Sequence, residues 1–157
     1  MKKLLLTIAL IVCAFIYVEA QPRAVGANIG FGISASYQHN LSEANFLDIA
    51  IDVPGFNAIG ASCTYDWVNP FNTSIPWAYE GSWNWSLGVG AGAGFGFGGW
   101  GYAGVVGHCG VAYDFEFPLQ LSVDYRPNIG AAFGNGWAGF YGDGLFAGIT
   151  LGVRYRF

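Results

Sequence analysis

The stretch LFAGITLGVRYRF, residues Leu145–Phe157, decides the fold. Every odd position in it is apolar, whereas the even positions hold Phe146, two glycines, Thr150 and two arginines. Side chains along a β-strand point alternately to opposite faces of the sheet. The stretch therefore predicts a strand with one apolar face and one face of small and polar residues.

The same alternation recurs along most of the chain upstream. Six more segments follow it: 25–38, 46–53, 59–67, 83–98, 102–115 and 117–126. A soluble β-sandwich carries its charges on the outward face. Here the charges share a face with glycine and serine, and the opposite face is apolar. The pattern predicts an all-β fold, a transmembrane antiparallel up-and-down β-barrel with its apolar face outward.

The composition points to the same class. Charged residues make up 10% of the chain, against about 25% in an ordinary soluble domain. Aromatic residues make up 18%, and 25 of the 157 residues are glycine. After residue 20 no apolar run is long enough for a membrane helix. Strands are then the remaining way for so much apolar surface to face lipid.

The first twenty residues predict a secretory signal peptide. A basic start, Lys2-Lys3, precedes an apolar run from Leu4 to Val18, and Ala20 is a suitable cleavage site. A transmembrane anchor is the alternative, but the run is short for one. We therefore expect a signal peptide at 1–20 and one barrel domain at 21–157.

Export removes every lysine of the chain. Residues 21–157 lose Lys2, Lys3 and Glu19, so the formal net charge changes from −4 to −5. Nucleic-acid binding needs a basic surface. The acidic remainder therefore argues against nucleic acid as a partner.

The number of strands is harder to predict from the sequence than the fold class. Pro54-Gly55 and Phe117-Pro118 predict tight turns, and 69–80 and 128–143 predict longer loops. Seven segments are visible, but bacterial barrels prefer even numbers of strands. We expect eight strands, with the eighth in 130–141 or in a different division of the glycine-rich stretch 86–114.

The last eight residues carry a resemblance to a known family. Thr150, Gly152, Tyr155 and the terminal Phe157 are spaced as in the β-signal of outer-membrane proteins, which the barrel-assembly machinery reads in that family. With Trp83–Gly94 and the segment PLQLSVDYRP at 118–127, the chain resembles small OmpA-like or OmpW-like outer-membrane barrels. The resemblance implies the outer membrane of a Gram-negative-type bacterium, no appended peptidoglycan-binding domain and no specific activity.

The predicted lumen face collects most of the charges: Asp48, Asp52, Asp66, Asp114, Asp124, Arg126, Arg154 and Arg156, together with His108. Buried charges are expected to pair. Arg154 and Arg156 fall near the periplasmic end of the last strand, and Asp114 and Glu116 fall beside a turn at that end. We expect a basic–acidic cluster that plugs the barrel floor, comprising Asp114, Glu116, Asp124, Arg126, Arg154 and Arg156. A gate or narrow pore is the alternative, but small barrels lack an open channel.

Other chemistry finds little support in the sequence. Gly94-x-Gly96-x-x-Gly99 is followed by no helical pattern, so it does not predict a dinucleotide site. We expect large side chains such as Phe46, Tyr102 or Phe146 to fill the space over the glycines. No cofactor, metal site or catalytic residue is predicted. Cys63 and Cys109 fall on the apolar face in non-adjacent segments, so we expect free thiols.

Three functions are compatible with these observations. The first is a non-enzymatic outer-membrane barrel, a monomer in the lipid of that membrane with a structural or surface role. The second is a narrow OmpW-like transporter of small apolar molecules. The third is a lipid A-modifying enzyme, for which His39, Ser42 and Glu43 are the conceivable group.

Overall fold

A computed structural model describes residues 21–71, 81–134, 136–143, 145 and 148–157. The predicted signal peptide, residues 72–80 of a predicted loop, and Phe146 lie outside these ranges. The described residues form ten strands: β1 (Gln21–Gly30), β2 (Gly32–Asn40), β3 (Asn45–Pro54), β4 (Ala58–Pro70), β5 (Gly81–Gly96), β6 (Trp100–Phe115), β7 (Leu119–Tyr125), β8 (Asn128–Gly134), β9 (Trp137–Asp143) and β10 (Ile149–Arg156). Among the described residues, no helix is both long and apolar enough to span a membrane.

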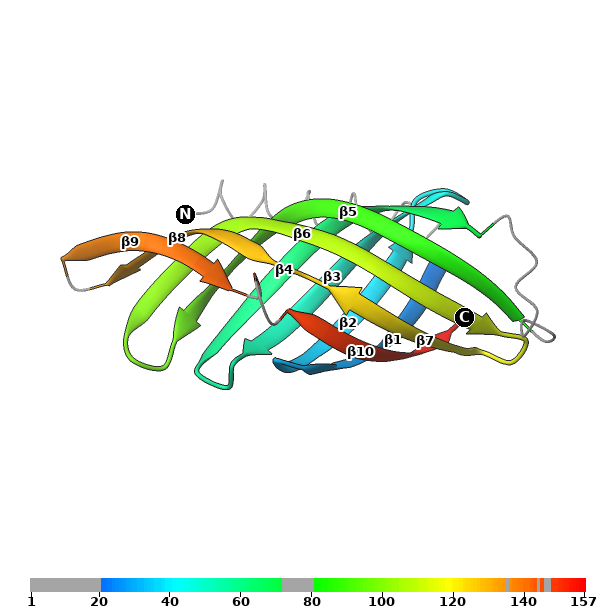
Figure 1. Ribbon diagram of the computed structural model, residues 1–157, viewed down its shortest axis with the longest axis horizontal. Helices are drawn as coiled ribbons and strands as arrows, with labels where there is room; N and C mark the ends of the chain where they lie inside the picture. The colour runs from blue at the N-terminus through cyan, green and yellow to red at the C-terminus, as the bar shows by residue number, and fades with distance from the viewer. Residues whose placement is uncertain (1–20, 72–80, 135, 144, 146–147) are drawn as a thin grey trace, which may run out of the picture.

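Eight of these strands close into an antiparallel barrel (Figure 1). Strands β1 to β7 pair in chain order, and β10 then lies between β7 and β1. The predicted fold class and the number of eight strands are confirmed. One rim, which we call the terminal rim, contains the bends at 41–44 and 116–118 and Phe157. The opposite hairpin rim contains the turns at Phe31, 55–57 and 97–99.

The eighth strand lies within the predicted segment 25–38. Reading that segment as one strand was wrong, and so were both places suggested for the missing strand. The chain reverses around Phe31, so that Ile29 pairs with Ile33. This reversal pairs odd residues with odd residues, and the alternation continues through it without a break. A Cβ at Gly30 would overlap the carbonyl oxygen of Ile149.

Residues 128–143 are not the predicted loop. They form β8 and β9, a hairpin that pairs with the first half of β6 and projects beyond the closed ring (Figure 1). Gly134 pairs with Trp137, so the two-residue connection sets even residues opposite odd ones. Strand β9 therefore faces outward with its even residues, opposite to the other strands, and a search for one continuous alternation misses it.

The two predicted tight turns are confirmed. Gly55 and Phe56 both have positive φ, 55° and 58°, and the amide of Asn57 donates to the carbonyl of Pro54 at 3.2 Å. Residues 116–118 form the bend between β6 and β7. Both turns join neighbouring strands of the ring.

The two faces of the ring follow the predicted alternation. Leu151 and Val89 on the outer wall are 63% and 49% exposed, whereas Asp124 and Arg154 in the lumen are 3% and 1% exposed. Cys63 and Cys109 are free and exposed, as expected. They lie on β4 and β6, which are separated by β5.

Candidate functional site

The lumen holds two hydrogen-bonded groups of buried and nearly buried polar side chains, which together we call the lumen network. It comes from seven of the eight ring strands, and β5 contributes none of its members. Its members are Asn28, Ser36, Gln38, Asp48, Thr64, Asp66, His108, Gln120, Ser122, Asp124, Arg126 and Arg154. All of them occupy even positions, because even residues point inward in these strands. Gln38, Asp48 and Arg126 form the smaller group, and the other members form the larger one.

Arg154 on β10 is the most heavily bonded member. Its guanidinium donates to Asp124 at 2.9 Å and to the hydroxyl of Ser122 at 2.5 Å. It also donates to Asn28, Ser36 and Gln120. Arginine stays charged in proteins, so Asp124 is its counter-ion. With this many partners, the cost of burying the guanidinium charge is compensated by its hydrogen bonds and its ion pair.

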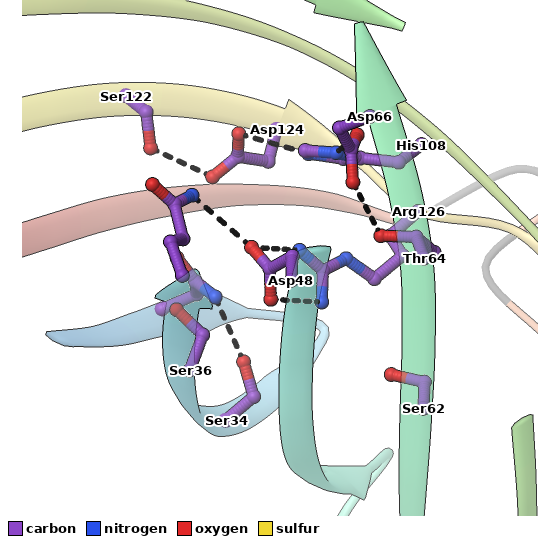
Figure 2. Close-up of polar contacts among 12 residues, drawn as sticks. Ser34, Ser36, Asp48, Ser62, Thr64, Asp66, His108, Ser122, Asp124 and Arg126 are labelled. Carbon is purple, nitrogen blue, oxygen red and sulfur yellow. Dashed lines mark hydrogen bonds and ion pairs between the residues drawn. The ribbon is translucent and has the colours of Figure 1, made fainter. Parts of the chain in front are cut away.

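His108 on β6 lies between two aspartates. Its Nδ1 contacts Asp66, and its Nε2 lies 3.2 Å from Asp124 (Figure 2). An ionised carboxylate can only accept hydrogen bonds. Each ring nitrogen thus faces a carboxylate oxygen, an arrangement that would suit an imidazolium with its two N–H donors. Thr64 donates to Asp66 at 2.6 Å and Ser122 donates to Asp124 at 2.7 Å, so both acids have further donors.

Arg126 links opposite walls of the barrel. It follows β7, and its two terminal nitrogens donate to the two oxygens of Asp48 on β3 at 3.1 and 3.4 Å (Figure 2). In the ring order, β3 and β7 are separated by β4, β5 and β6 on one side and by three strands on the other. The pair therefore crosses the lumen. Such two-pronged pairs are among the stronger charge-assisted hydrogen bonds.

Further charged residues lie at the terminal rim, and Gln120 joins them to the lumen network. Arg156 Nε is 3.7 Å from Asp114, which also accepts from Asn84 at 2.9 Å and from Gln120 at 2.7 Å. Glu116 lies in the bend beside them and is exposed; among the described residues it joins no ion pair. The six residues of the expected cluster therefore divide. Asp124 and Arg154 belong to the larger group of the lumen network, and Gln120 joins that group to Asp114 and Arg156 at the rim. Arg126 belongs to the smaller group with Asp48, and Glu116 is apart from all of them.

Several charged residues of the lumen were not placed in that cluster. Asp48, Asp66 and His108 were assigned to the lumen face, but their partners could not be read from spacing. Arg23 was missed altogether, because it occupies an odd position. A bulge between Pro22 and Ala24 shifts it, and its guanidinium lies 4.8 Å from the ring centre of Phe46.

Large side chains fill the space beside the lumen glycines. The hydroxyl of Tyr102 would lie 2.5 Å from a Cβ at Gly94, and Val106 would lie 2.9 Å from one at Gly92. The expectation that Tyr102 fills this space is confirmed. Phe46 instead packs against Arg23 near the terminal rim.

Cavities remain on either side of the lumen network. One of about 80 Å³ lies at the hairpin rim, beside Asp52, Tyr102 and Asn128. Another of about 400 Å³ lies at the terminal rim, beside Arg23 and Arg156. The buried side chains of the network separate the two.

Comparisons of the chain with protein-family models, with curated proteins and with solved structures find no match.

The last strand closes the ring. Gly152 is buried, and a Cβ there would lie 2.6 Å from the amide oxygen of Asn28. Thr150 faces the lumen side, and its hydroxyl lies 3.5 Å from the carbonyl of Asp124. Tyr155 and Phe157 point outward and pack edge to face, with ring centres 5.3 Å apart. Of the predicted β-signal, Gly152 and Thr150 thus approach the neighbouring strands β1 and β7, whereas Tyr155 and Phe157 contact each other on the outer wall.

The outer wall carries an apolar groove of about 670 Å³ over β6, β7 and β10. Tyr113, Leu121 and Val153 line it. Two lumen-facing residues, Ser122 and Gly152, line it as well, and they pair with each other across β7 and β10.

The possible catalytic group near the terminal rim does not assemble. His39 contacts the hydroxyl of Tyr37 at 3.3 Å. Ser42 accepts from the amide of Ala44 and from the side chain of Asn45, and so stabilises the bend at 41–44. Within the described part of the chain, no hydrogen bond joins His39 to Ser42 or Glu43. That part also contains no group of three or more His, Cys, Asp or Glu that could hold a metal ion.

Proposed function

We propose that this chain is an integral outer-membrane β-barrel of a Gram-negative-type cell, closed to ions, with a structural or surface role and no catalysis. In this proposal residues 1–20 direct export, and the C-terminal strand is read by the barrel-assembly machinery. The outer wall supports a lipid environment, since it is apolar along every strand of the ring. Closed barrels satisfy all backbone hydrogen bonds within the protein, as lipid requires.

The Arg126–Asp48 pair is the observation that carries the closed state. It joins opposite walls, and Asp48 is fully buried. His108 and Arg154 occupy the remaining width with their own partners. An ion would have to displace these mutually satisfied charges, and eight-stranded barrels are only wide enough for side chains to fill them.

Conductance across a planar bilayer tests the closed state. We expect the refolded protein to pass almost no current, whereas the double variant Asp48→Ala/Arg126→Ala should conduct measurably. Leu121→Ala on the outer wall is the matched control and should pass no more current than the unaltered protein. A steady ion-selective current through the unaltered protein would overturn the proposal.

Membrane placement needs its own experiment. The full chain should fractionate with the outer membrane and should migrate differently on a gel before and after boiling. Recovery in a soluble fraction would contradict the proposal. If the protein does not modify lipid A, the mass of lipid A from cells that express it should be unchanged.

The groove on the outer wall favours transport of small apolar molecules as a second candidate. A side opening between β7 and β10 would connect lipid with the lumen at Ser122 and Gly152. Val153→Trp would fill the groove from the outside. If uptake of a small hydrocarbon by expressing cells falls in this variant and not in Ile129→Trp, transport becomes the better account.

A further inference from the structure

Strand β9 is an open sheet edge. Among the described strands it has a neighbour on one side only, β8, whereas every strand of the ring has two. The hairpin extends beyond the ring, where no described strand lies against its second edge (Figure 1). Open edges present backbone donors and acceptors that another strand can use.

The connection between β8 and β9 decides which backbone groups point to the open edge. Gly134 and Trp137 flank a two-residue connection, and such a flanking pair exchanges both of its hydrogen bonds. Trp137, Gly139 and Tyr141 therefore bond to β8. The N–H and C=O groups of Ala138, Phe140 and Gly142 point away from β8.

The edge lacks the usual protection against pairing. Natural edge strands carry lysine, proline or a bulge, and β9 contains no lysine and no proline. Its one charged residue, Asp143, is at its end. The outer face is apolar as well, with Phe140 75% and Phe133 47% exposed. The unpaired backbone groups and the apolar face beside them together favour a partner strand.

We propose that β9 pairs antiparallel with β9 of a second copy of the chain, in place of the monomer expected from the sequence. An antiparallel pair of identical strands is self-complementary about a two-fold axis. Only a register centred on Phe140 pairs all three outward residues, with Ala138 opposite the partner's Gly142. The same register sets Asp143 opposite the partner's Trp137, so the two aspartates do not meet. This interface rests on the proposed membrane placement.

Cross-linking in isolated membranes tests the interface. In a chain with Cys63→Ala and Cys109→Ala, Phe140→Cys should form a covalent dimer with a short bismaleimide. Phe95→Cys is the matched control: Phe95 is 71% exposed on the outer wall of β5, and it should remain monomeric. Equal cross-linking at both positions, or a product with a protein of another mass, would overturn the pairing.

Two further variants separate pairing from folding. Ala138→Pro removes an N–H that points to the open edge and none that bonds to β8. Phe140→Lys adds a charge at the axis. Each should lower the dimer fraction at least tenfold, with the heat-modifiable band retained, whereas Phe95→Lys should not. A heat-modifiable barrel that is monomeric before any substitution overturns this inference alone, while failure to reach the outer membrane overturns the proposed function.

Discussion

The outer wall and the lumen of the same strands obey opposite rules. On β7, Leu121 and Val123 face outward and are exposed, whereas Gln120, Ser122 and Asp124 face inward and are buried. A soluble domain would show the reverse. The comparison teaches that burial does not require apolar side chains. It requires partners for the buried polar groups, and the lumen network provides most of them. Gln38 Oε1 and Arg23 Nε are buried atoms without one among the described residues.

The largest effect is expected where a lumen charge loses its partner. Arg154→Ala removes the guanidinium that pairs with Asp124 and donates to four other buried side chains. Breaking this buried pair should lower the free energy of unfolding by about 3 to 5 kcal/mol. Urea titration in lipid vesicles measures this. Arg156→Ala is the control: its side chain is 37% exposed, and an exposed pair contributes only about 0 to 1 kcal/mol. Equal losses in the two variants would show that the network does not stabilise the barrel.

The next effect concerns the outer wall. Leu151→Arg places a charge in the middle of β10 on the apolar face, and in a bilayer this should cost about 2 to 4 kcal/mol. Leu41→Arg, in the bend at the terminal rim, should change stability by less than about 1 kcal/mol, since charges near the interface cost little. The same vesicle titration compares them. A Leu151→Arg protein as stable as the parent would mean that this face meets water.

A smaller effect is expected where the lumen has no room. Gly94→Ala would bring a Cβ to 2.5 Å from the Tyr102 hydroxyl, and such overpacking costs about 1 to 3 kcal/mol. Gly98→Ala meets no atom closer than 3.4 Å and should be milder. If the two variants unfold at the same urea concentration, Tyr102 does not fill the lumen as described.

The smallest effect is expected at the hairpin rim, in a turn that belongs neither to the outer wall nor to the lumen. Phe56 has φ 58°, a conformation that asparagine tolerates better than an aromatic residue. Phe56→Asn should raise the free energy of unfolding by about 0.5 to 1 kcal/mol. Phe117→Asn, in a bend without positive φ, provides the comparison. A loss of stability on Phe56→Asn would indicate that the aromatic side chain of Phe56 stabilises the fold by more than its backbone strain costs.

Much of the barrel could be predicted because its alternation has a single cause. Period two assigns each side chain to a face, so Leu151 was placed outside and Asp124 inside before any pairing was known. The pairing of the strands was not predictable in the same way. The reversal at Phe31 preserves the alternation, which hid a strand boundary. The connection at 135–136 inverts the alternation, which hid β9.

The sequence predicted which residues face the lumen better than it predicted which of them contact one another. The residues of the lumen network were assigned to one face, but Arg126 and Asp48 lie 78 positions apart in the chain, and no local pattern can pair them. Arg23 was lost because one bulge moves a single side chain to the other face. Such irregularities depend on the neighbouring strand and leave no periodic signal.

The sequence by itself determined which side chains face outward and which face the lumen, since that follows from the alternating geometry of an extended backbone. The tertiary structure alone decided which charges meet, how β7 and β10 close the ring, and that β9 is left with an open edge. Those features depend on strand order and register around the barrel, which join residues far apart in the chain.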